Sequence, residues 1–202
     1  TAELPGLYSE HDFDLVGFVV GAAEKKDLID GSSITEGDLI VGLPSSGLHT
    51  NGFSLVRKIF NTDSNPGILD HYYPELGKTL IDELLIPHRS YYRPLSPFLQ
   101  SIKGMIHITG GGFIENIPRT IPNNLSAHLK LSAWNIPPIY RLIQKEGKIS
   151  DREMFSVFNM GIGMMIVTDP GDADNLLQNI PDSTKLGYVT KNSSNDAVIL
   201  DA

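Results

Sequence analysis

Residues 45–58 constrain what this chain can fold into more than any other stretch of the sequence. They follow residues 38–43, an apolar run of strand length. Farther on, apolar side chains recur at the spacing of one helix face, at Leu55, Val56, Ile59 and Phe60. The stretch between is dense in glycine, hydroxyl and amide side chains, which are typical of loops. The sequence therefore predicts a strand, a polar loop and a helix in direct succession.

The loop of this unit is suited to hold an anion. A helix start leaves backbone N–H groups without partners, and the helix dipole adds positive potential there, so phosphate is a favoured ligand. His49 and Asn51 add side-chain donors, and the imidazole titrates near neutral pH. The residues expected to contact phosphate are Ser45, Ser46, Gly47 and Gly52. The alternative is a tight glycine turn that binds nothing.

Two common nucleotide-binding motifs are not met. Gly42 and Gly47 have the spacing of half a Walker A loop, but Leu48 and His49 stand where Lys and Ser or Thr are required. Residues 161–163 begin a Gly-x-Gly-x-x-Gly pattern, yet its sixth position is Ile166 and the pattern opens a strand. This argues against a dinucleotide site, which needs the glycines between a strand and a helix.

A second strand–loop–helix junction lies at residues 107–113. A short apolar strand, residues 104–109, runs into Gly110, Gly111 and Gly112, where no Cβ blocks the approach of a ligand to the backbone. Thr109 adds a hydroxyl, so Thr109 and the three glycines are predicted to bind phosphate. His107 stands beside them as a candidate catalyst. The alternatives are a plain glycine turn and a structural histidine.

Composition narrows the classes of function. The chain has 202 residues, a net charge of −8 and no cysteine. The absence of cysteine excludes disulfides, thiolate catalysis and Cys-based zinc sites, and the acidic balance argues against a nucleic-acid surface. The longest apolar stretch, residues 15–23, is too short for a membrane span of about 20 residues. No signal peptide is visible, so neither a membrane nor a nucleic-acid partner is expected, and the cytoplasm is the expected location.

The remaining pattern predicts a single α+β domain. Apolar and alternating stretches favour strands at residues 14–24, 38–43, 104–109, 125–131, 161–168, 185–190 and 197–200. Helical spacing and Pro or Gly stops favour helices at residues 78–85, 91–102, 113–117, 138–146, 151–158 and 172–180, besides the helix after residue 52. The expected fold is a mixed, largely antiparallel sheet with helices packed on its faces.

No metal site is assigned from the sequence. His11, Asp12 and Asp14, with Glu3 before them, are oxygen-rich enough for magnesium, but such a cluster is more often a solvated face. His71, His88 and His128 show no ligand spacing.

The chain resembles a known family, the C-terminal domain of phosphoribosylformylglycinamidine cyclo-ligase, which is also called aminoimidazole ribonucleotide synthetase. Residues 1–8, 14–18, 45–58 and 107–118 carry the match, and residues 158–164 resemble a further family segment. The specific parts are the Ser-Gly-Leu-His-Thr-Asn-Gly helix start and the string His-Ile-Thr-Gly-Gly-Gly-Phe-Ile-Glu-Asn-Ile-Pro. The wider superfamily, which includes selenophosphate synthetase and thiamine-monophosphate kinase, shares the fold and the use of ATP.

The resemblance implies a two-domain protomer that forms a homodimer. Residues 1–13 would connect to an N-terminal domain, absent from this sequence, that holds most of the ATP and magnesium site, and residues 14–202 would form the C-terminal domain. The implied reaction converts formylglycinamidine ribonucleotide into aminoimidazole ribonucleotide. ATP phosphorylates an amide oxygen of the substrate, and the imidazole ring then closes. His49, Asn51 and His107 are then the candidate catalytic residues. The alternatives are another ATP-dependent synthetase or kinase of the superfamily, or an inactive phosphate-binding fragment.

Overall fold

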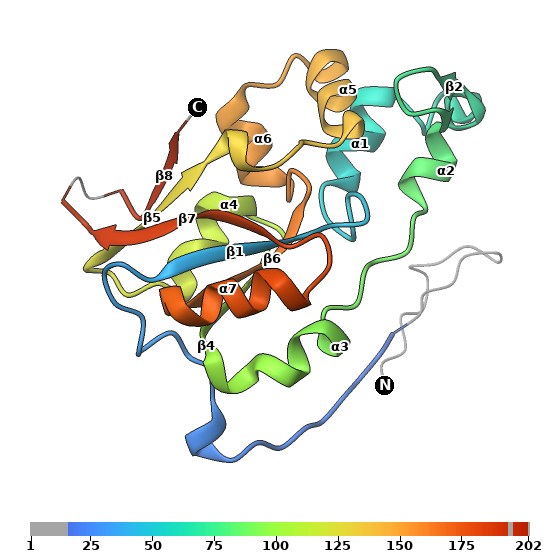
Figure 1. Cartoon of the computed structure of the whole chain (residues 1–202). Helices are drawn as coiled ribbons and strands as arrows, with labels where there is room; N and C mark the ends of the chain where they lie inside the picture. The colour runs from blue at the N-terminus through green and yellow to red at the C-terminus, as the bar shows by residue number, and fades with distance from the viewer. Residues whose placement is uncertain (1–15, 194–195, 202) are drawn as a thin grey trace, which may run out of the picture.

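A computed structural model describes residues 16–193 and 196–201 of the chain (Figure 1). Six strands form the main sheet: β1 (Leu39–Pro44), β4 (Ile102–His107), β5 (Leu125–Lys130), β6 (Ile162–Thr168), β7 (Thr184–Lys191) and β8 (Val198–Asp201). A separate pair is formed by β2 (Tyr72–Tyr73) and β3 (Lys78–Thr79). The α-helices are α1 (Phe53–Phe60), α2 (Leu80–Leu84), α3 (Tyr92–Leu95), α4 (Gly112–Asn116), α5 (Pro138–Gly147), α6 (Asp151–Val157) and α7 (Pro170–Asn179).

The order of strands across the main sheet is β4-β6-β1-β7-β5-β8. Every neighbouring pair is antiparallel except β5 and β8, which are parallel. β1 therefore lies inside the sheet, between β6 and β7, and the adjacent β6 carries β4 on its other side. The predicted α+β fold, with a mixed and largely antiparallel sheet, is confirmed.

Helices cover both faces of this sheet. Successive residues of a strand point to opposite faces, and Ile40 packs into one apolar core while Val41 and Leu43 pack into the other. The first core contains buried side chains of α1, α4, α5 and α6. The second contains those of α3 and α7, and Figure 1 shows α7 lying across the sheet near β1. Burial on both faces explains why β1 reads as a continuous apolar run.

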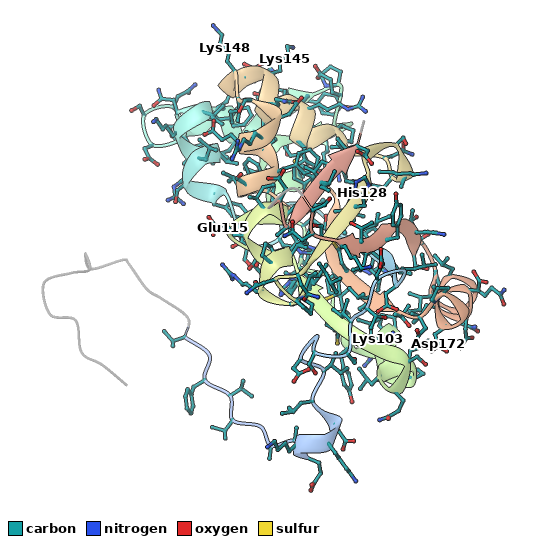
Figure 2. All side chains as sticks on the ribbon, turned by 90° about the vertical axis from the view of Figure 1, so that its left-hand side faces the viewer. Lys103, Glu115, His128, Lys145, Lys148 and Asp172 are labelled. Carbon is teal, nitrogen blue, oxygen red and sulfur yellow. The ribbon has the colours of Figure 1, made fainter. Side chains whose placement is uncertain are left out.

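The prediction of a buried strand at residues 14–24 was wrong for the part that the structure describes. Residues 16–24 form no strand, and the side chains of Val16, Phe18 and Val19 are each about nine-tenths exposed, at 91%, 91% and 92%. Figure 2 shows this segment standing clear of the sheet. Its apolar composition indicates a need for burial, but a strand also needs a neighbour that accepts its backbone hydrogen bonds. No described strand pairs with it.

Two predicted helices are shorter than expected. The predicted helix at residues 91–102 is divided into α3 and a 3₁₀ segment, Ser96–Ser101, and Ile102 already begins β4. Within the predicted helix at residues 78–85, the first two residues form β3, and α2 begins at Leu80. Pro97 lies at the start of the 3₁₀ segment, where its fixed φ and missing N–H favour a break in the α-helix.

An ion-pair network ties the edge strand β4 to the rest of the domain. Lys103 Nζ contacts Asp38 Oδ1 at 2.8 Å and Asp169 Oδ1 at 2.9 Å, and Figure 2 labels Lys103 on the side where α7 lies. Asp38 is buried at 2% exposure, so its charge needs this partner. Among the described residues no helix is both long and apolar enough to cross a membrane.

Candidate functional site

The first loop, residues 45–52, connects β1 to α1 and is held by the buried side chain of Asn159. Asn159 Oδ1 accepts hydrogen bonds from Ser45 Oγ at 2.8 Å, Tyr140 Oη at 2.7 Å and the amide of Gly161 at 2.9 Å. Its Nδ2 donates to the carbonyl of Gly47 at 3.0 Å. A buried amide side chain whose oxygen and nitrogen are both hydrogen-bonded fixes the backbone around it. The first loop is therefore a rigid feature rather than a loose connection.

The second loop, residues 108–111, connects β4 to α4 and is held by Asn116. Asn116 Nδ2 donates to the carbonyls of Thr109, Gly110 and Gly112 at 3.3, 3.1 and 2.7 Å. Thr109 Oγ1 in turn donates to Asn116 Oδ1 at 3.1 Å. Two carbonyls of this loop and the first carbonyl of α4 are thus turned onto one side chain. The amides of Gly110 and Gly111 donate to no acceptor among the described residues.

The two loops meet. A Cβ built at Gly110 would lie 3.4 Å from Asn51 Oδ1, so these two predicted site residues are neighbours. In the described part of the chain, the amides of Thr50, Asn51 and Gly52 also donate to no protein acceptor. The two loops that carry these unpaired N–H groups are therefore neighbours at Asn51 and Gly110, and such groups are satisfied by water or by an anionic ligand.

Glycine is required at the helix end of each loop. Gly52 has a φ of +83°, and a Cβ there would overlap the ring of Phe158. Gly112 has a φ of +55°, and a Cβ there would overlap the backbone carbonyl of Phe155. Only glycine adopts such a φ freely and leaves room for so close a contact. Both glycines bring their loops against α6 and the residue that follows it.

Three histidines lie beside the loops. His49 and His107 were predicted from the sequence, and His88, from the segment between α2 and α3, lies between them. The rings of His49 and His88 have centroids 3.8 Å apart, and His88 Nε2 is 3.2 Å from His107 Nε2. His49 is 6% exposed and has a φ of 60°, an uncommon conformation outside glycine. The amide of Ser46 donates to its Nε2 at 3.1 Å.

The segment that carries His88 is tied to the end of β1. Ser46 Oγ donates to the carbonyl of Pro87 at 2.7 Å. The hydroxyl of Tyr91 donates to the carbonyl of Pro44 at 2.9 Å, and Arg89 Nη1 donates to the same oxygen at 3.4 Å. Segment and loop are thereby fixed relative to each other. A cavity of about 490 Å³ adjoins them, lined by His88, Arg89, Ser90, Tyr91, Tyr92, Leu95, Leu99, Met105 and Met164.

Two of the three imidazoles are held neutral at pH 7. Burial, and then the charges of His88, His107 and Arg89, lower the pKa of His49 to about 4. Burial, and then the charge of His88, lower the pKa of His107. A neutral imidazole offers one nitrogen as a donor and one as an acceptor. His49 and His107 therefore present neutral rings, each with one donor and one acceptor nitrogen, rather than fixed charges.

The structure brings most of the predicted residues together. Gly110 lies beside Asn51, and His49 and His107 both lie beside His88. The sequence reasoning missed His88 and Asn159. His88 lies in an irregular segment with no spacing to mark it, and Asn159 is a single amide whose partners in the first loop, Ser45 and Gly47, are distant in sequence. Glu3, His11, Asp12 and Asp14, considered for magnesium, lie outside the described residues.

Comparison with solved structures concerns the fold. Thiamine-monophosphate kinase from Stenotrophomonas maltophilia K279a matches with a TM-score of 0.54 and 13% identity, over 89% of this chain and 54% of that chain. The hydrogenase maturation protein HypE in complex with ATP matches with a TM-score of 0.52 and 14% identity, over 84% of this chain and 49% of that chain. At such identities the likeness shows a shared fold and nothing more.

Comparison of sequences gives nearer relatives. A phosphoribosylformylglycinamidine cyclo-ligase of Caldicellulosiruptor bescii is 50% identical over 176 residues, 86% of this chain and 52% of the relative. Its namesake in Bifidobacterium longum is 45% identical over 207 residues, 99% of this chain and 60% of the relative. The chain thus spans little more than half the length of these relatives. The family model described as AIR synthase related protein, C-terminal domain, matches residues 35–199, so the chain belongs to that family.

Proposed function

We propose that this chain is the C-terminal domain of an ATP-dependent cyclo-ligase that forms aminoimidazole ribonucleotide from formylglycinamidine ribonucleotide. The names of relatives that are 45–50% identical over most of this chain support the reaction. The observation that carries the proposal is the meeting of the two glycine-bearing loops at Asn51 and Gly110, beside neutral imidazoles.

The chemistry explains why such a surface is useful. The amide oxygen of the substrate is a poor leaving group, and transfer of a phosphoryl group from ATP converts it into phosphate. The amidine nitrogen of the same molecule then attacks the activated carbon, the C–O bond breaks, and phosphate leaves as the ring closes. Catalysis of such steps is mostly positioning and stabilisation of charge on oxygen.

The residues of this chain fit the holding of phosphate. The amides of residues 50–52 and 110–111 donate to no described acceptor, and oriented N–H groups stabilise oxyanions without rearranging. We assign Gly47, Gly52 and the run from Thr109 to Gly112 to the phosphate of the substrate or the transferred phosphoryl group. Ser45 and Ser46, whose amides and hydroxyls already donate within the protein, hold the first loop in place for that ligand. His49 and His107 then take or give the proton that moves in ring closure, and Asn51 orients the substrate.

Magnesium is assigned to no described residue. In the described part of the chain the one cluster of potential metal ligands is made of histidines, whereas magnesium prefers carboxylate and phosphate oxygens. In line with the family resemblance, we propose that the magnesium ion and most of the ATP contacts belong to the N-terminal domain of a two-domain protomer. A homodimer located in the cytoplasm belongs to the same proposal.

A superfamily kinase or synthetase with another substrate is the second candidate. The shared fold with thiamine-monophosphate kinase favours it, because one fold serves several substrates. A panel of phosphorylated acceptors offered to the two-domain protein separates the two, since the cyclo-ligase consumes ATP only with formylglycinamidine ribonucleotide.

Phosphate binding by the loops is testable on the chain itself. Titration of the ¹⁵N-labelled chain with inorganic phosphate and with ribose 5-phosphate is expected to shift the amide resonances of residues 50–52 and 110–111. Gly110→Ala should weaken this binding at least several-fold, because its methyl group would occupy the space between the loops, at ordinary contact distance from Asn51.

Gly171→Ala is the matched control, since a Cβ there meets nothing within 4 Å. It should leave the titration unchanged. Shifts spread over the whole domain, or equal binding by Gly110→Ala and the original chain, would contradict the assignment of the loops.

A further inference from the structure

The histidine cluster has a feature that the proposed reaction does not use. One ring nitrogen from each of His49, His88 and His107 lies within 4.8 Å of the other two. The three come from separate segments: the loop after β1, the segment between α2 and α3, and the end of β4. We propose that His88 and His107, with His49 as a third and weaker ligand, bind a transition-metal ion such as Zn²⁺.

The separation of the two principal ligands fits one ion. His88 Nε2 and His107 Nε2 are 3.2 Å apart. Two imidazole nitrogens bound tetrahedrally to zinc at about 2.0–2.1 Å lie roughly 3.3–3.4 Å from each other. The metal-free pair shares one proton between these nitrogens. When an ion takes the place of this proton, the proton moves to Nδ1 of the same ring, so that each neutral imidazole binds the ion through Nε2 and keeps one N–H.

The donor set selects the kind of metal. The cluster offers three imidazoles and, among the described residues, no carboxylate takes part in it. Imidazole nitrogens suit zinc, copper and nickel, whereas magnesium and calcium prefer oxygen. Arg89 follows His88 in the chain, and its charge acts on His49. Its repulsion of a cation leads us to expect micromolar rather than nanomolar affinity.

His49 is placed to be the weakest ligand. Its Nε2 accepts the amide proton of Ser46 at 3.1 Å, so the neutral ring carries its own proton on Nδ1. That Nδ1 is buried and has no hydrogen-bond partner among the described residues. Ligation through Nδ1 moves the proton to Nε2 and gives up the Ser46 hydrogen bond. The ion therefore gains less from His49 than from the other two histidines.

Calorimetric titration of the untagged 202-residue chain with ZnCl₂ at pH 7.5 tests the site. We expect one ion per chain with a micromolar Kd. His88→Gln and His107→Gln should each weaken binding at least tenfold, and His49→Gln should weaken it less. His71→Gln is the matched control because His71 is exposed and outside the cluster, and it should leave the affinity unchanged.

Co²⁺ in place of Zn²⁺ gives a readout on the unaltered chain that does not depend on how a variant folds. Its visible absorption should show the strong bands of a tetrahedral nitrogen site. The proposal is overturned if no ion binds, if the cobalt spectrum is that of hydrated octahedral Co²⁺, or if the His88→Gln, His107→Gln double variant binds zinc as the original chain does. None of these outcomes depends on ATP or turnover, so they leave the proposed reaction untouched.

Discussion

Replacing Asn159 with leucine is expected to lower the free energy of unfolding by about 3–5 kcal/mol, since each buried polar group left without a partner costs about 1–3 kcal/mol. The side chain is 4% exposed. Leucine would remove the acceptor of Ser45 Oγ and Tyr140 Oη and the donor to the carbonyls of Gly47 and Leu48. Chemical denaturation followed by circular dichroism measures the loss.

Two further variants give this prediction its scale. Tyr140→Phe removes one hydroxyl, whose single proton is shared between Asn159 Oδ1 at 2.7 Å and the carbonyl of Gly47 at 2.8 Å, and should cost about 1–2 kcal/mol. Asn179→Leu makes the same change on an exposed helix position and should stay within about 0.5 kcal/mol. A loss below 1 kcal/mol for Asn159→Leu would show that the first loop does not depend on this amide.

The largest expected effect on activity is that of His107→Gln. The test needs a two-domain protein, and a chimera in which this chain replaces the matching region of the Caldicellulosiruptor bescii relative supplies one. If His107 moves a proton in ring closure, turnover should fall by a factor of about 10² or more, while the KM for formylglycinamidine ribonucleotide changes little. Glutamine keeps a polar side chain of similar reach but does not titrate, so proton transfer is what the change removes.

His71→Gln in the same chimera is the control, because it makes the identical substitution at an exposed histidine outside the cluster. Its turnover should equal that of the unaltered chimera. An effect of only a few-fold for His107→Gln would return His107 to a structural role beside His88.

The core of the fold could be predicted because its elements carry their own patterns. β1 is apolar throughout since it is buried on both faces, and α1 repeats apolar residues on the face that packs against the sheet. Residues 16–20 carry an equally strong apolar signal, yet Val16 and Phe18 are exposed. Apolar composition indicates that a segment is stabilised by burial, but it does not predict which surface covers the segment.

The site was predictable only where one stretch of sequence holds all of it. A local density of glycine and polar side chains marks two such stretches, from Ser45 to Gly52 and from His107 to Gly112. His88 has no such neighbourhood, and it reaches His107 only because Ser46 and Pro44 bind the segment that carries it. The local sequence likewise does not mark Asn159, since two of its partners, Ser45 and Gly47, lie more than a hundred positions away.

The central claim is that this chain supplies the substrate-binding half of a cyclo-ligase, and turnover by the chimera tests it most directly. Product formation is measured with ATP and magnesium, in the presence and absence of formylglycinamidine ribonucleotide and, separately, with thiamine monophosphate. The account predicts aminoimidazole ribonucleotide, with one ADP and one phosphate formed per ring closed, only with the first substrate. A folded chimera that binds ATP but hydrolyses it independently of formylglycinamidine ribonucleotide, or phosphorylates thiamine monophosphate instead, would contradict it.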